Sequence, residues 1–550
     1  MRLQELVDAL HRGFDAEAAM TDVKALCEFD RYQVSAGLQA AAEYVADRVP
    51  LRDVEVRQHR PESRWWTFRG PPAWTPVSAT LEVGGTALVS YPDQPYALGA
   101  FSAACAGRTV PVSAETRPGA LVLAPELSPH ELARRGVFGF VTRAGRVELP
   151  PHSPLVAFCV DEEQLAVLRQ AGHARVSVEL GEPVQMPVVS GLLPGTGPEL
   201  LLTAHLCHPR PSANDNASGV AALMAVASLL RETAGAPVRF VWGPEFVGTA
   251  AYLQDAPVPA VAVNVDMAGE DQALCGGPLV IERSPDEKPS YVTALAERVA
   301  ALMPGTRSYS GAVPCDVWSW RSVPHVGASD HALVPCPNVG LNHWPDRFNH
   351  TASDTFDKVS ADELRRTTAL AAAVIGAIRV DDGSLKADVA DATSAWAAAY
   401  VAGGLAGAAP RRQLEWDEPV YDPWATTAAA RRLAHRRAVA QATVASLRQP
   451  PTSGEPRSGG VVAFWDGPFN LRALAEDCSQ QDRAWLDARI AEDRGGAYAR
   501  MSALARGIDG RRSRYSVGWW AALASELTVP VAFAQRFLDV LCAAGWAGES

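Results

Sequence analysis

Cysteine is scarce in this chain, and its scarcity argues against one class of fold. The 550 residues include nine cysteines, which is an odd number and a small one for this length. We therefore expect no disulfide framework, and a reducing compartment is the simpler prediction. The first residues, MRLQELVDALHRGFDAEAAM, carry acidic side chains and lack an uninterrupted apolar segment. We accordingly expect no secretory signal and predict a cytoplasmic protein.

An excess of positive charge and long apolar runs are also missing. The formal net charge of −12 argues against a protein that mainly binds nucleic acid or anionic lipid. No stretch approaches the roughly 18 consecutive apolar residues that a membrane-spanning helix needs. The nearest, residues 395–410, is short, alanine-rich and interrupted by glycines. We expect neither a nucleic-acid partner nor a membrane partner.

The composition that is present is that of a folded, multidomain protein. Hydrophobic residues make up 48% and charged residues 20% of the chain, and its length predicts more than one core. Changes in composition and hydrophobic periodicity along the sequence predict a discontinuous catalytic domain, a β-rich insertion, a helical connector, a linker rich in Pro, Ser and Gly, and a C-terminal domain. Their expected bounds are 1–65 with 186–380, then 66–185, 381–448, 449–460 and 461–550.

Strands and helices alternate in the second part of the predicted catalytic domain. Apolar strands are expected at 199–207, 238–242 and 261–267, with shorter apolar runs at 325–327 and 339–342. Helices are expected at 218–231, 249–254 and 361–378. This α/β alternation predicts a mostly parallel sheet covered by helices on both faces. In such sheets the reactive residues gather where the strands end.

Polar side chains stand at several of these strand ends. His205 and His208 close the first strand in LLLTAHLCHP, and Asp215 precedes the next helix in NDNASG. Glu245 and Asp266 follow the next two strands, and His350 precedes the long last helix. Taken singly, each has an ordinary explanation, such as a structural histidine or a helix N-cap at Asp215. Because they recur at equivalent places, and because imidazole and carboxylate are zinc ligands, we predict a metal site.

The order of these motifs resembles the co-catalytic zinc aminopeptidase family. The segments that carry the resemblance are TAHLCHP, NDNASG, WGPE, NVDMAG, SDH and HTASDT, and it covers about residues 20–380. The family includes bacterial leucyl aminopeptidases and glutamate carboxypeptidase-like enzymes. The resemblance implies a phosphorylase/hydrolase-like mixed sheet flanked by helices, one or two zinc ions, and a protease-associated-like insertion at 66–185. It also implies metal ligation by His205, Asp215, Asp266 and His350, a bridging role for Asp215, and supporting roles for Asp330 and Asp354.

The sequence departs from the family pattern at two places. The usual His-x-Asp is here His205-Leu206-Cys207, and the usual pair of adjacent glutamates is reduced to Glu245. One hypothesis joins both departures: Glu245 is the general base, and His208 replaces the missing carboxylate ligand. The zinc ions would then be held by His205, His208 and Asp215, and by Asp215, Asp266 and His350. In the competing arrangement Glu245 is a ligand of a single metal, and Cys207 is a further candidate ligand.

The resemblance implies a hydrolase that cleaves an amide or peptide bond next to a free amino group. We expect an aminopeptidase that acts on a small peptide or an aminoacylated metabolite, with Glu245 as general base. Arg347 could hold a substrate carboxylate, although a solvent-exposed loop arginine is an equally good interpretation. Two alternatives stay open. One is a non-catalytic relative that binds peptide or a regulator, and the other is aminoacyl transfer of the glutaminyl cyclase type.

The C-terminal sequence resembles a winged helix–turn–helix, and an aminopeptidase-like subgroup of the family carries a similar trailing unit. From residue 501 onward it has five arginines and four acidic residues, which is little net charge for a phosphate-binding surface. We therefore expect a docking or homo-oligomerisation module in preference to a DNA-binding one.

Overall fold

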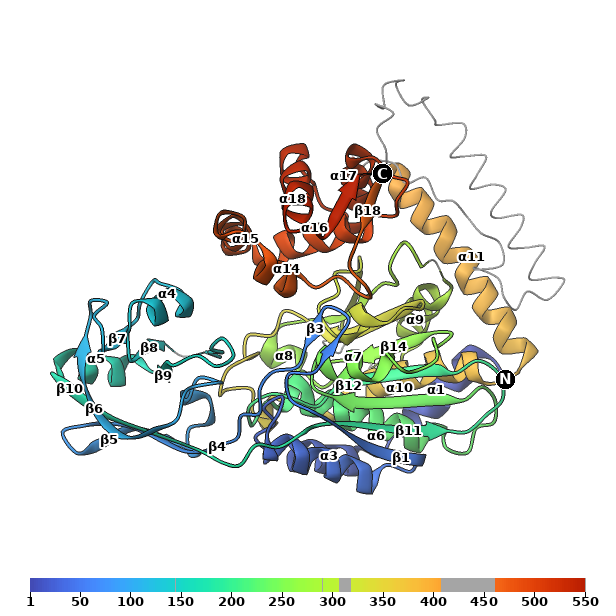
Figure 1. The fold of residues 1–550 in the computed structure, drawn as a ribbon. Coiled ribbons are helices and arrows are strands. Elements are labelled where there is room, and N and C mark those ends of the chain that lie inside the picture. Colours follow the sequence, from blue (N-terminus) through green and yellow to red (C-terminus); the bar gives the residue numbers. More distant parts are fainter. Residues whose placement is uncertain (144, 289, 306–317, 407–459, 550) are drawn as a thin grey trace.

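The computed structural model describes residues 1–143, 145–288, 290–305, 318–406 and 460–549, which form three units (Figure 1). One is a central α/β unit, one is a β-rich unit beside it, and one is a mostly helical C-terminal unit above it. The predicted linker, except for Gly460, and the connector after residue 406 lie outside the described residues. Within the described ranges, no helix is long and apolar enough to cross a membrane.

The central unit is built on an eight-stranded sheet with the order β1-β11-β13-β12-β14-β17-β15-β16. Strands β13, β12, β14 and β17 are parallel neighbours, whereas β1 and β11 at one side and the β15–β17 pairing are antiparallel. The sheet is therefore mixed, as the family resemblance implies. The bounds are β1 (Arg52–His59), β11 (Met186–Leu193), β12 (Leu200–His205), β13 (Val238–Gly243), β14 (Ala262–Val265), β15 (Leu279–Glu282), β16 (Trp320–Val323) and β17 (Asn338–His343).

The central strands are apolar on both sides because both faces of the sheet are covered. In β12, Leu200 and Leu202 pack with the helices on one face, while Leu201 packs with α7 and the β2–β3 hairpin on the other. The helices that cover the first face are α1 (Leu3–Gly13), α2 (Ala16–Leu26), α3 (Ala36–Arg48), α6 (Gly219–Leu230), α9 (Val292–Leu302) and α10 (Ala361–Arg379). The elements that cover the second face are β2 (Arg64–Trp65), β3 (Phe68–Arg69) and α7 (Val247–Leu253). The long helix α11 (Gly383–Ala406) extends from this unit toward the C-terminal unit (Figure 1).

The short apolar run at 325–327 does not form a strand. These residues are a loop, and the nearby strand is β16, which ends at Val323. Pro324 follows directly, and a proline cannot donate a hydrogen bond to a sheet ladder. The backbone N–H groups of Val326 and Gly327 donate to the side chain of Glu282 instead.

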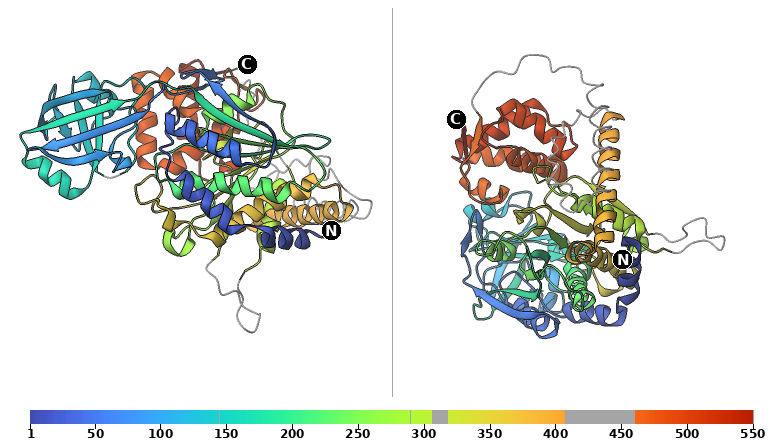
Figure 2. Two further views of the ribbon diagram at one scale, coloured as in Figure 1. Left: turned by 90° about the horizontal axis from the view of Figure 1, so that it is seen from below. Right: turned by 90° about the vertical axis from the view of Figure 1, so that its right-hand side faces the viewer.

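The β-rich unit lies to one side of the central sheet (Figure 2). Its seven-stranded sheet has the order β5-β4-β10-β6-β7-β8-β9 and its own apolar core. The bounds are β4 (Pro76–Val83), β5 (Thr86–Tyr91), β6 (Cys105–Ser113), β7 (Leu121–Leu123), α4 (Pro129–Arg134), β8 (Gly139–Arg143), β9 (Val156–Val160), α5 (Glu162–Gln170) and β10 (His173–Leu180). The sequence pattern indicates only one good helix here, α4, and misses α5. The limits 66–185 and the protease-associated label stay predictions.

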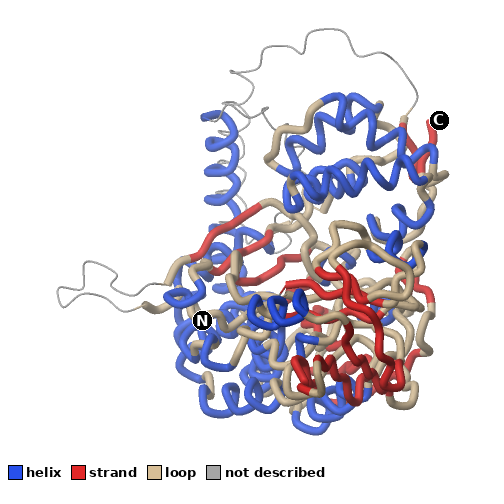
Figure 3. Tube along the Cα trace, turned by 90° about the vertical axis from the view of Figure 1, so that its left-hand side faces the viewer, coloured by secondary structure: helices blue, strands red, loops and turns tan. Residues whose placement is uncertain are grey.

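The C-terminal unit is mostly helical (Figure 3). Its helices are α14 (Leu471–Asp477), α15 (Gln480–Glu492), α16 (Arg494–Arg506), α17 (Arg514–Ser525) and α18 (Val531–Ala543), and β18 (Val461–Ala463) pairs with β19 (Ala547–Glu549). It contacts the central unit through polar groups: Arg506 donates to the carbonyl of His325 at 3.0 Å, and Tyr498 donates to that of Gly327 at 3.3 Å. The winged-helix label stays a prediction.

Candidate metal centre

The first ligand group joins the ends of β12 and β14 to the loop before α6. His205 Nε2 lies 3.1 Å from Asp266 Oδ1 and 3.3 Å from Asp215 Oδ1. The parallel pairing of β12 and β14 brings His205 and Asp266 to the same edge of the sheet. All three residues are buried, so their polar atoms face one another and not bulk solvent.

The second ligand group uses the other oxygen of Asp215. His350 Nε2 lies 3.1 Å and His208 Nε2 lies 3.6 Å from Asp215 Oδ2, and the two imidazole nitrogens are 3.2 Å apart. The structure therefore brings together all five predicted ligands but divides them differently from our hypothesis. His208 shares its group with His350, while His205 shares its group with Asp266. The two histidines approach different oxygens of Asp215, because His205 Nε2 is nearest Oδ1 and His208 Nε2 is nearest Oδ2.

Arg31, which the sequence analysis missed, holds the turn that places His208. Its buried guanidinium donates to the carbonyls of Leu206 and Ser212, at 2.9 and 3.1 Å. Its backbone also pairs with that of His208 in both directions. Both ends of the segment from Leu206 to Ser212 are thus fixed to the N-terminal helical region. A lone arginine between two predicted helices gives no signal of this role.

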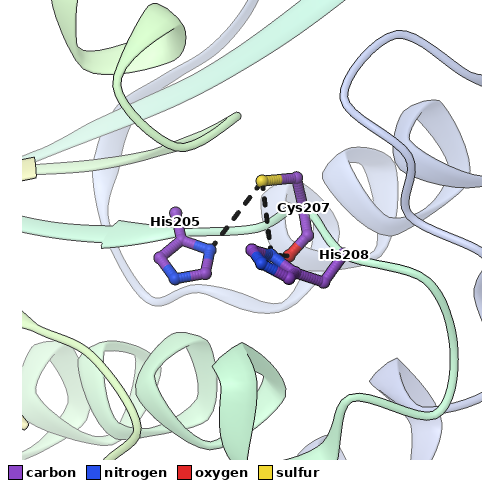
Figure 4. A group of neighbouring side chains, drawn as sticks. All are labelled: His205, Cys207 and His208. Atoms are coloured by element: carbon purple, nitrogen blue, oxygen red, sulfur yellow. Dashed lines mark hydrogen bonds between the residues drawn. The ribbon is translucent and has the colours of Figure 1, made fainter. Parts of the chain in front are cut away.

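Cys207 lies against the two histidines, with its sulfur directed at both rings (Figure 4). Its Sγ is 3.8 Å from His205 Nδ1 and 3.6 Å from His208 Nδ1, whereas the Nε2 atoms face Asp215. The sulfur also accepts the backbone N–H of Glu245 at 3.1 Å. This position orients the two imidazoles and the start of the Glu245 turn, as residues behind metal ligands commonly do.

The loop that carries Asp215 is held by side chains from elsewhere in the fold. Asp354 accepts the backbone N–H groups of Asn214 and Asp215, at 2.8 and 3.0 Å. Burial, only partly offset by these hydrogen bonds, raises the pKa of Asp354 to about 7. Asn349 donates to Asp215 Oδ2 at 2.7 Å. The predicted supporting position of Asp354 therefore has a specific contact in the structure.

Glu245 lies at the turn between β13 and α7, beside the first ligand group. Burial raises its pKa to about 7, although the nearby His205 acts in the opposite direction. The next residue, Phe246, donates its backbone N–H to Asp330 Oδ1 at 2.6 Å. Asp330 thus holds the turn that carries Glu245, and burial raises its own pKa to about 6. A carboxyl group that titrates near neutral pH is suited to exchange a proton with substrate.

The charges within the two groups are complementary. Although burial disfavours a charged imidazole, Asp266 and Asp215 raise the pKa of His205 well above its usual value. Although burial also disfavours a carboxylate, His208, His205 and His350 lower the pKa of Asp215 well below its usual value. Burial lowers the pKa of His208, and Arg146 lowers it further. An anionic Asp215 flanked by neutral His208 is the protonation pattern that metal binding requires.

The one predicted substrate-binding residue, Arg347, has a backbone partner, and it stays a prediction. It donates from Nε to the carbonyl of Cys275 at 3.1 Å. Arg146, from the loop between β8 and β9 of the β-rich unit, lies at the second group instead. Its Nη1 is 2.6 Å from His208 Nε2 and 3.4 Å from His350 Nε2, and its Nη2 pairs with Glu148 at 3.2 Å. No pattern in the sequence indicates Arg146, because it lies 62 residues before His208 in a loop of another unit.

The donor set fits zinc. Each group offers three nitrogen or oxygen atoms, which are the ligands that zinc takes from histidine and aspartate. Asp215 contributes one oxygen to each group, and a carboxylate used in this way bridges two metal ions.

Comparisons with known proteins agree with this chemistry. Residues 188–375 match the model of peptidase family M28, and residues 22–266 match that of a domain of unknown function, DUF4910. No curated protein matches the chain in sequence.

Solved structures show the same fold. A zinc aminopeptidase from Bacillus subtilis, BSAP, is 19% identical over 67% of this chain and 96% of its own, with a TM-score of 0.51. A protein from Clostridium acetobutylicum, provisionally named a peptidase, is 12% identical over 99% of this chain and 98% of its own, with a TM-score of 0.53. A glutaminyl cyclase from Porphyromonas gingivalis matches with a TM-score of only 0.35 and 13% identity, which is too low a similarity to support an inference.

Proposed function

We propose that this chain, a zinc metallopeptidase whose residues 188–375 match the model of peptidase family M28, is a cytoplasmic aminopeptidase that acts on a small peptide or an aminoacylated metabolite. The observation that carries the proposal is the division of five side chains into two groups around Asp215. Glu245 beside them supplies a proton-transferring group.

Glu245 carries the proton in the proposed reaction. When bound, zinc lowers the pKa of water toward neutrality and stabilises negative charge on a carbonyl oxygen. Glu245 takes the proton of the attacking water and passes it to the departing amine, which is general base and then general acid work. Asp330 keeps the turn in position, and Cys207 fixes the backbone of Glu245 against the histidines.

Arg146 supplies a cation at the edge of the site, and we assign it the recognition of an anionic group of the substrate. Its guanidinium faces His208 and His350 and is paired on its other side with Glu148. A planar guanidinium binds a carboxylate through two parallel hydrogen bonds. The C-terminal carboxylate of a dipeptide is the simplest group that lies near a scissile bond. The role of Arg347 in substrate binding also stays a proposal. It has less support than that of Arg146, because Arg347 Nε donates a hydrogen bond to a backbone carbonyl.

The test is a substrate panel combined with metal analysis. We expect the zinc-loaded chain to release free amino acid from dipeptides and more slowly from the corresponding dipeptide amides. Arg146→Met should raise KM for the free dipeptide and leave the amide almost unchanged, because only the former has a carboxylate. Arg143→Met is the matched control, since Arg143 is an exposed arginine of the same β-rich unit that pairs with Glu162.

Other outcomes would select the alternatives. Zinc binding without any turnover would favour a non-catalytic peptide-binding or regulatory relative. Loss of ammonia from an N-terminal glutamine peptide, without uptake of water, would favour aminoacyl transfer of the glutaminyl cyclase type. Failure to bind zinc would contradict the assignment of the centre.

The C-terminal unit supports a docking or homo-oligomerisation role more than nucleic-acid binding. Its arginines are largely occupied by acidic partners: Arg514 pairs with Asp539 and Glu549, and Arg536 pairs with Asp482. A surface that binds phosphates would need these cations free. Sedimentation of the full chain with and without duplex DNA would test both parts of this proposal.

A further inference from the structure

A second cluster of metal-binding side chains lies outside the centre around Asp215. Glu282 ends β15, His325 lies in the loop after β16, and His331 lies in the short helix η3 (Asp330–Leu333). His331 Nε2 is 2.8 Å and His325 Nδ1 is 3.7 Å from Glu282 Oε1. All three side chains are at most 5% exposed.

Two imidazole nitrogens of this cluster lack a hydrogen-bond partner. Neither Nδ1 of His331 nor Nδ1 of His325 makes a hydrogen bond of acceptable geometry within the described part of the chain, whereas His331 Nε2 faces Glu282 Oε1 at 2.8 Å. A buried polar atom without a partner is costly, so its retention calls for an explanation. The rings meet edge to face with centroids 5.2 Å apart, and both present a nitrogen to Glu282.

The packing around His331 holds its ring in place. A Cβ atom added at Gly340 of β17 would lie 2.8 to 3.0 Å from three atoms of that ring. Glycine at this position therefore makes room for the imidazole directly against the backbone of the sheet. The contact fixes the ring so that Nε2 faces Glu282.

We propose that Glu282, His325 and His331 form a separate zinc site. Two imidazoles and one carboxylate are a zinc ligand set, and bonds of about 2.0–2.2 Å in tetrahedral geometry place ligand atoms roughly 3.3–3.6 Å apart. The observed separations of 2.8 and 3.7 Å lie on either side of that range. Three protein ligands leave the fourth position to a water molecule.

The proposed ion would stabilise the loop that connects the active centre with the C-terminal unit. Residues 325–331 carry Asp330, which holds the turn of Glu245, and the carbonyls that accept from Arg506 and Tyr498. Arg506 and Lys288 are close enough to His325 to disfavour an additional positive charge there. The site should therefore bind zinc more weakly than the centre around Asp215, which has more carboxylate oxygens.

The first experiment measures zinc per folded chain. The full-length protein is loaded with a small excess of zinc, desalted and analysed by elemental mass spectrometry. We expect His325→Ala to bind one ion fewer than the parent, and Asp215→Asn to lose ions from the active centre while it keeps this one. The second variant separates a failure of this proposal from a failure of the proposed function. Equal zinc content in the parent and in folded His325→Ala would overturn the proposal.

A matched control and a second readout cover the case of misfolding. His343→Gln alters another buried histidine that faces a carboxylate, since His343 Nε2 lies 3.6 Å from Glu363, and it should leave the zinc content unchanged. If His325→Ala does not fold, anomalous scattering at the zinc edge is measured from crystals of the zinc-loaded parent to determine whether zinc occupies the proposed site. A peak within bonding distance of Glu282, His325 and His331 supports the proposal, and its absence overturns it.

Discussion

At the scale of the single residue, Glu245 has two candidate roles that predict different losses on substitution. As a base it transfers a proton without holding a metal, and as a ligand it holds a metal. Its pKa of about 7, which results from burial, suits the first role. His208 lies in the second ligand group, and if it replaces the missing family glutamate, as we propose, Glu245 stays free for proton transfer.

We therefore expect Glu245→Gln to lower kcat by about 10²- to 10⁴-fold, the usual contribution of a general base, and to leave zinc binding intact. Glutamine keeps the shape of the side chain but cannot accept and release the proton. Steady-state kinetics and elemental analysis on the same preparation check both parts. Loss of zinc together with activity would favour the ligand role instead.

Glu270 provides a residue-scale prediction about stability and pH. It is fully buried, and burial together with Asp346 raises its pKa from 4.5 to about 8. The native chain thus holds a proton that the unfolded chain releases above about pH 4.5. The contribution of this proton to the free energy of unfolding is fully present below about pH 4.5 and is lost as the pH rises through about 8.

Glu270→Gln should flatten that dependence. Glutamine can still accept the backbone N–H of Gly277, which Glu270 Oε1 accepts at 3.0 Å, but it does not ionise. We expect the melting temperature of the parent to fall more between pH 5.5 and 8.5 than that of the variant. Thermal unfolding of both proteins in the same buffers measures the difference, and parallel curves would contradict the assignment.

At the scale of the element, Asn216 connects two strand ends with the helix that follows them. Its Nδ2 donates to the carbonyls of His205 and Val265, at 3.2 and 3.4 Å. Its Oδ1 accepts the backbone N–H groups of Gly219 and Met267, at 3.1 and 2.9 Å. One side chain thereby fixes the ends of β12 and β14, which carry His205 and Asp266, relative to α6.

Asn216→Ala should weaken both the fold and the metal centre. Each buried group left without a partner costs about 1–3 kcal/mol, and support residues behind metal ligands affect metal affinity by roughly 10- to 100-fold. Thermal unfolding and zinc titration with a competing chelator measure the two effects. Asn264→Ala is the control, because that buried amide bonds only to the side chains of Thr203 and Ser329, so stability should fall without a comparable loss of zinc affinity.

At the scale of the whole molecule, the C-terminal unit contacts the loop that supports the active centre. Arg506 donates to the carbonyl of His325 and pairs with Glu287 at 3.3 Å, and Arg283 pairs with Glu526 at 2.5 Å. On the opposite side of the unit, Asn470 donates to the carbonyl of Thr67 at 3.1 Å. These contacts couple the position of the C-terminal helices to the order of residues 325–331.

Arg506→Met should loosen that loop. A hydrogen bond from a charged group contributes about 1.5–3 kcal/mol, so amide exchange in residues 325–331 should accelerate by roughly 10- to 100-fold. Hydrogen–deuterium exchange with mass spectrometry follows these peptides. Arg511→Met is the control, since Arg511 is exposed, and its variant should exchange like the parent. Unchanged exchange in Arg506→Met would show that the C-terminal unit does not order the loop.

The amino-acid pattern alone was enough to predict which side chains gather at the centre. His205, His208, Asp215, Asp266 and His350 could be named because parallel strands end at one edge of a sheet, so polar residues after apolar strands converge there. The supporting contact of Asp354 and the mixed sheet also followed from the motifs. These features depend on local patterns, which a sequence displays directly.

Which of these residues share a group follows from the folded chain. The pairing of His208 with His350 depends on the segment from Leu206 to Ser212, which Arg31 holds from another part of the fold. The approach of Arg146 depends on how the β-rich unit packs beside the central sheet, and the loop at 325–327 depends on Glu282. Contacts between distant segments produce no periodic pattern in the sequence, because they arise from packing in the folded chain.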